Sequence, residues 1–199
     1  MSEPRIGRVL VASLHQAIAD LLPTRLEFYE NWLNVSGLRD GTIGLAPLSA
    51  VLSFLRAEGE PYGLITARAG QYAAEWTMNS VSAFERRVIR ALPTAFRLRA
   101  ALRVARGLVR ATYPGSRALV RIRRGTVSID LRGSLFCEVR EASMLPLCGF
   151  YAAAFTRVLQ LCDIPGDTRV SACRAAGGRK GCTMAVIVTA ASTGESAVA

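Results

Sequence analysis

The spacing of apolar residues changes at Tyr113-Pro114-Gly115, and one further helix, over Leu147–Leu161, is expected after this point. Before this point they recur every three or four residues, as in Leu10, Leu14 and Ile18, which is the period of an α-helix. After it they alternate with polar residues, as in Thr126–Leu131, which is the period of a β-strand. Segregated helices and strands predict an α+β fold, with a helical layer packed on a small twisted antiparallel sheet.

Proline and glycine residues mark the expected ends of the elements. The expected helices cover 10–21, Thr24–Asn34, 47–58, Leu64–Leu92, Thr94–Thr112 and Leu147–Leu161. The expected strands cover Arg117–Arg123, Thr126–Leu131, Ser134–Val139, Thr168–Cys173 and Cys182–Thr189, with Arg124-Gly125 as a hairpin turn. No linker divides the sequence, so we expect one domain over residues 1–190 and a flexible tail over 191–199.

Composition excludes several classes of protein. Hydrophobic residues make up 51% of the 199 residues and charged residues 20%, which excludes an intrinsically disordered chain. The longest uncharged stretches, Gly41–Leu55 and Ala142–Thr156, are shorter than the ~18 residues of a membrane-spanning helix. Charged residues bracket the short apolar run near the N-terminus, which is not typical of a secretory signal. We therefore expect a soluble, cytoplasmic protein.

The chain is strongly basic, with 25 lysine and arginine residues against 15 acidic ones and a formal charge of +10. Four arginines fall at helical spacing on one face of the segment Thr94–Thr112: Arg99, Arg103, Arg106 and Arg110. Such a face could bind an acidic membrane or protein surface, or it could be an ordinary solvated helix face. Aromatic side chains that would stack on bases are sparse nearby, which makes nucleic acid an unfavoured partner.

Little in the sequence points to catalysis. His15 is the single histidine, and phosphate-binding or nucleophile-elbow motifs do not occur, so an enzyme is the less favoured class. The five cysteines all follow residue 136. An odd number of cysteines without a secretory signal argues against a disulfide framework and favours buried thiols or a metal site.

The most specific segment runs from Pro146 to Val188. It contains Pro146-Leu147-Cys148, a helix beginning Gly149-Phe150-Tyr151, the sequence Cys173-Arg174-Ala175-Ala176-Gly177, and then Cys182. In these motifs the chain resembles the 4-vinyl reductase domain family, over about a quarter of its length. The resemblance implies a fold similar to TRAPP vesicle-tethering subunits and haem nitric-oxide-binding domains, in a homodimer.

The resemblance also implies a hydrophobic pocket between helices and sheet that holds a lipid, tetrapyrrole or aromatic molecule. The residues that could line it are Trp76, Phe84, Phe150, Tyr151 and Phe155, although helical spacing makes them equally good core residues. The leading expectation is thus a carrier or sensor of a hydrophobic small molecule. One alternative is a bacteriochlorophyll-pathway 4-vinyl reductase or its accessory protein, and another is a scaffold that docks through the arginine face.

In the phenol-sensing members of the family, three cysteines and a glutamate hold zinc. Cys148, Cys173 and Cys182 match the three cysteines, whereas Val170 stands in the place of the glutamate. Because a tetrahedral zinc site needs four ligands, Cys137 is our candidate for the fourth. The alternative is that all the cysteines are small buried hydrophobic residues.

Overall fold

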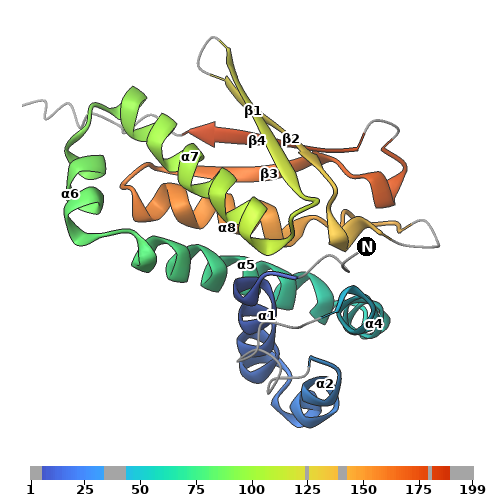
Figure 1. The fold of residues 1–199 in the computed structure, drawn as a ribbon. Helices are drawn as coiled ribbons and strands as arrows, with labels where there is room; N and C mark the ends of the chain where they lie inside the picture. The colour runs from blue at the N-terminus through green and yellow to red at the C-terminus, as the bar shows by residue number, and fades with distance from the viewer. Residues whose placement is uncertain (1–5, 34–43, 124–125, 139–142, 179–180, 189–199) are drawn as a thin grey trace, which may run out of the picture.

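The computed structural model describes residues 6–33, 44–123, 126–138, 143–178 and 181–188. It confirms the α+β fold: a helical layer packs on one four-stranded antiparallel sheet (Figure 1). The helices are α1 (Arg8–Leu21), α2 (Leu26–Leu33), α4 (Leu45–Ala57), α5 (Pro61–Ser80), α6 (Ala83–Ala91), α7 (Thr94–Thr112) and α8 (Gly149–Leu161). Short 3₁₀ turns lie at η1 (Pro23–Arg25), η2 (Leu135–Cys137) and η3 (Arg174–Ala176).

The sheet has the strand order β1-β2-β4-β3, so the C-terminal strand β4 lies in the middle beside β2. The strands are β1 (Arg117–Arg123), β2 (Thr126–Arg132), β3 (Gly166–Ala172) and β4 (Cys182–Val188). Val127, Ile129 and Leu131 of β2 are buried, whereas the alternating Ser128 and Arg132 are exposed. The period-two pattern therefore defines the face of the sheet that the helices cover.

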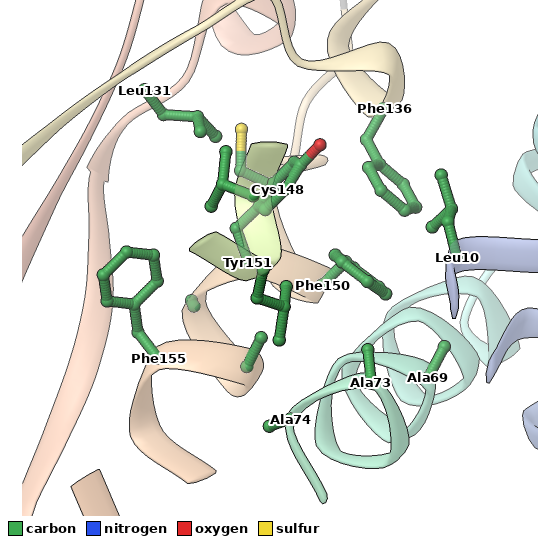
Figure 2. Packing of buried hydrophobic residues seen from close by; sticks show 14 of the residues in the cluster. Leu10, Ala69, Ala73, Ala74, Leu131, Phe136, Cys148, Phe150, Tyr151 and Phe155 are labelled. Carbon is green, nitrogen blue, oxygen red and sulfur yellow. The ribbon is translucent and has the colours of Figure 1, made fainter. Parts of the chain in front are cut away.

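Helix α8 is the centre of the molecule, between the sheet and α5 (Figure 1). Its Phe150 ring stacks on Phe136 at 4.9 Å, and Tyr151 meets both rings edge-on (Figure 2). Helix α8 also packs closely on α5 at Gly70, where a Cβ would lie 2.1 Å from the carbonyl oxygen of Phe150. Glycine at this crossing therefore lets the two helix backbones meet.

The helix expected over Leu64–Leu92 is wrong as a single element, because the structure divides it into α5 and α6. Val81 has an extended backbone and ends α5. Ser82 then accepts a hydrogen bond from the backbone N–H of Glu85 and caps the start of α6. The hydrophobic period continues across this junction and so does not predict the break. A serine at an N-cap position is the local signal that could have predicted it.

The strand expected over Ser134–Val139 is also wrong where the structure describes it. Gly133 has a positive φ of 64°, which turns the chain away from β2, and residues Leu135–Cys137 form the 3₁₀ turn η2. This turn carries Phe136 and Cys137 into the core instead of along the sheet edge.

Some expectations fall outside the described residues: the Arg124-Gly125 turn and the tail over 191–199. Within the described ranges, none of the helices combines the length and apolarity needed to cross a membrane.

Candidate metal centre

Four of the five cysteines, which are far apart in the sequence, meet at one end of the sheet. Cys137 ends η2, and Cys148 is the residue before α8. Cys173 lies between β3 and η3, and Cys182 is the first residue of β4. All four side chains are buried, and their sulfur atoms lie within 4.8 Å of one another. The structure therefore brings together the three cysteines that the resemblance implied and Cys137, which we expected as the fourth.

The sulfur–sulfur distances describe a compact group. Cys137 Sγ lies 2.9 Å from Cys148 Sγ and 3.4 Å from both Cys173 Sγ and Cys182 Sγ. Cys173 Sγ is 3.5 Å from Cys148 Sγ and 3.9 Å from Cys182 Sγ. These separations exceed the ~2.05 Å of a disulfide bond, and the cysteines are free. Four sulfur ligands around one small volume could hold a metal ion.

Backbone N–H groups support two of the sulfurs. The N–H of Leu147 donates to Cys173 Sγ at 3.4 Å, and that of Arg174 donates to Cys182 Sγ at 3.3 Å. Hydrogen bonds of this kind orient the sulfurs and stabilise negative charge on them, as the outer shell of a metal site does. The sequence motifs predict the cysteines of the cluster but not these donors, because donation depends on how the backbone turns at each cysteine.

The electrostatics of the group favour a bound cation. The pKa of Cys182 is lowered, because the thiols of Cys137 and Cys148 and the N–H of Arg174 act on its sulfur as hydrogen-bond donors. The pKa of Cys148 is raised by its interactions with Cys137 and Cys182 and by burial. One thiolate thus suppresses ionisation of its neighbours. A metal cation would remove this conflict, because its charge lets all four sulfurs be thiolates together.

A surface pocket of about 420 Å³ adjoins the cluster. Cys137 and Cys182 line it together with Ser134, Arg132 and Arg174. The charged residues of its lining are Arg174, Glu138 and Arg132, and the Arg132 guanidinium donates to Asp130 Oδ2 at 3.1 Å. We did not expect these arginines from the sequence, because β2 and η3 become neighbours only through the pairing of β2 with β4.

Cys162 does not belong to the cluster. It follows α8 at the end opposite Cys148 and is buried by itself. Burial raises the pKa of its thiol, so it is a neutral core side chain.

The structure does not gather the five residues expected to line a hydrophobic pocket. Phe150, Tyr151 and Phe155 of α8 are buried and pack in the core. Trp76 of α5 is half-buried and stacks on Tyr72 at 5.7 Å. Phe84 is 77% exposed, because it begins the separate helix α6 and points away from the core. Its assignment to an internal pocket is therefore wrong. Two pockets lined by described residues include none of the five.

The arginine face of α7 is formed in part. Arg99, Arg103 and Arg110 are exposed, and Arg106 is half-buried beside them. The opposite side of α7 is buried against the rest of the fold, as its apolar positions predict.

No family model, no curated protein and no solved structure matches this chain. The 4-vinyl reductase resemblance, and the ligand-binding function that it implies, stay predictions.

Proposed function

We propose that this protein is a zinc-binding domain whose four-cysteine centre holds one Zn²⁺ and fastens the sheet to the helical layer. The observation that carries the proposal is the meeting of the four sulfurs within 4.8 Å. A zinc ion bound to four cysteines at about 2.3 Å from each sulfur separates the sulfurs by about 3.8 Å along the edges of the tetrahedron. Cys173 Sγ lies near this distance from Cys182 Sγ, at 3.9 Å, and from Cys148 Sγ, at 3.5 Å. Cys137 Sγ is closer to the other three sulfurs, at 2.9–3.4 Å, so an ion would move it outward by less than about 1 Å.

The compactness of the group favours a single ion over an iron–sulfur cluster. A cluster places several iron atoms and inorganic sulfides between its cysteine ligands, and so needs its thiolates farther apart. Four thiolates in a tetrahedral arrangement are typical of structural zinc, because all positions around the ion are filled by protein. Zinc at this centre would therefore stabilise the fold and would not activate water or substrate.

The positions of the four cysteines in the fold indicate which elements the ion would hold together. Cys137 follows β2, Cys148 precedes α8, and Cys173 and Cys182 flank the β3–β4 turn. One ion would thus cross-link the sheet to the start of its central helix. Such a cross-link stabilises the folded state, because the metal binds the folded chain and not the unfolded one.

Metal analysis of the purified protein tests the proposal. We expect about one zinc per chain and no visible absorbance band of an iron–sulfur centre. Cys173→Ser should lose most of the zinc, whereas Cys162→Ser should keep it, because Cys162 is also buried but stands apart from the cluster. Iron with visible absorbance, or zinc lost equally from both variants, would contradict the proposal.

A stability measurement on the unmodified protein avoids the risk that Cys173→Ser fails to fold. Free zinc at about one hundred times its dissociation constant should stabilise the folded chain by about 2.7 kcal/mol over the metal-free chain. Thermal unfolding after removal of zinc by a chelator, and again after zinc is restored, measures this difference. An unchanged melting temperature would overturn a structural role.

A further inference from the structure

Helix α6 exposes an apolar face that no described part of the chain covers. Phe84 is 77% and Val88 43% exposed, and Ala91 is exposed as well. Their spacing of four and three residues places them on one face of the helix. Ile89, on the opposite side, is buried and attaches α6 to the rest of the molecule. The residues that the structure describes therefore leave this stripe largely open.

The first turns of α7 also expose an aromatic ring, with an arginine beside it. Phe96 is 56% exposed, and the guanidinium of Arg99 lies over its ring at 5.7 Å from the centroid. An arginine held over an exposed aromatic ring places a cation and an apolar surface side by side.

These two helices hold most of the excess positive charge of the protein. Between Ala83 and Thr112 the sequence has eight arginines and one acidic residue, Glu85, a net charge of +7 out of the +10 of the whole chain. Arg87, Arg99 and Arg103 are exposed. One ion pair from outside partly offsets the charge, since Arg90 Nε lies 3.6 Å from Asp163 Oδ2.

We propose that α6 and the first turns of α7 dock on an anionic lipid bilayer. The arginines would bind lipid phosphate and carboxylate groups, while Phe84, Val88 and Phe96 enter the boundary between headgroups and acyl chains. Basic residues beside exposed aromatic and aliphatic ones are typical of helices that lie in the membrane interface. A single short helix with these groups gives reversible, salt-sensitive attachment.

Other occupants fit the same surface less well. A symmetric dimer would place this face against its own copy and bring arginines of like charge together. A nucleic acid would satisfy the arginines but would leave the Phe84–Val88 stripe against charged phosphates. Figure 1 shows α6 at the opposite end of the molecule from the β3–β4 turn that carries the metal centre, so the proposal does not depend on zinc.

Co-sedimentation with vesicles tests the proposal on the full chain. We expect binding to vesicles of phosphatidylcholine mixed with phosphatidylserine, weak binding to phosphatidylcholine alone, and release as salt rises. The double variant Phe84→Ser, Val88→Ser should bind about ten-fold more weakly. The control pair Leu64→Ser, Met144→Ser removes two exposed apolar side chains elsewhere and should bind like the unmodified protein.

The arginines are tested in the same way. Arg99→Gln with Arg103→Gln should weaken binding about ten-fold or more, whereas Arg25→Gln with Arg169→Gln should change it little. Unchanged circular dichroism shows that each variant is folded. Equal binding to both kinds of vesicle, or no difference between the Phe84/Val88 pair and its control, would overturn the proposal. Two further results would also overturn it. One is a protein that binds no vesicles and forms a dimer which the double variant Phe84→Ser, Val88→Ser dissociates, and the other is binding to duplex DNA in place of vesicles.

Discussion

Helices α6 and α8 both carry a phenylalanine on an apolar face, but the phenylalanine of α8 is buried whereas that of α6 is exposed. Phe150 of α8 is fully buried and stacked on Phe136, and its ring lies beside Leu10 of α1 and Ala73 of α5 (Figure 2). Phe84 of α6 is mostly exposed. The difference shows that an apolar stripe reports only that a helix has a face to cover. What covers it, the chain itself or another partner, depends on the position of the helix in the fold.

Truncating the two phenylalanines should show the largest contrast. Phe150→Ala removes a buried ring and leaves a cavity, so we expect a loss of about 3–5 kcal/mol in the free energy of unfolding. Phe84→Ala should change it by no more than about 0.5 kcal/mol, because the ring is already in solvent. Urea unfolding followed by circular dichroism measures both. Similar losses for the two variants would mean that α6 is packed in solution.

Two glycines should respond differently to substitution, one at the centre of the molecule and one on an outer helix. Gly70→Ala should destabilise the protein by about 1–3 kcal/mol, because its Cβ would meet the Phe150 carbonyl and force α5 away from α8. Gly107→Ala in α7 should stabilise it by about 0.5–1 kcal/mol, because no described atom outside the local backbone of α7 lies within 4 Å of the new Cβ and alanine favours helix. Thermal unfolding of the two variants measures whether each change in stability is a loss or a gain. A neutral Gly70→Ala would show that the α5–α8 crossing is loose.

The smallest expected effect concerns the start of α6. Ser82→Ala removes the cap on the Glu85 N–H and should cost about 1 kcal/mol. We expect the loss to appear mainly as faster amide hydrogen exchange within α6, because few contacts couple this helix to the core. Ser80→Ala is the control, since its hydroxyl bonds within α5 and caps no following helix. Equal exchange in both variants would argue that packing, and not the cap, holds α6.

The sequence predicted those features whose causes are local. The helix Thr94–Thr112 has its predicted bounds because Pro93 precedes it, and the alternation in β2 defined its buried face. The short motifs around Cys148, Cys173 and Cys182 were enough to predict three cysteines of the cluster. Cys137 was harder, because a strand was expected there and only the turn after Gly133 directs its sulfur inward.

Periodicity and short motifs are properties of neighbouring residues, and they were enough to predict the fold class and the cysteines of the cluster. The tertiary structure settled which cysteines meet, with Cys137 in the cluster and Cys162 outside it, and which phenylalanine is enclosed, Phe150 and not Phe84. These outcomes depend on the pairing of β2 with β4 and on the passage of α8 between α5 and the sheet. Such contacts join residues far apart in the chain, so the free energy that fixes them is not encoded in any local segment.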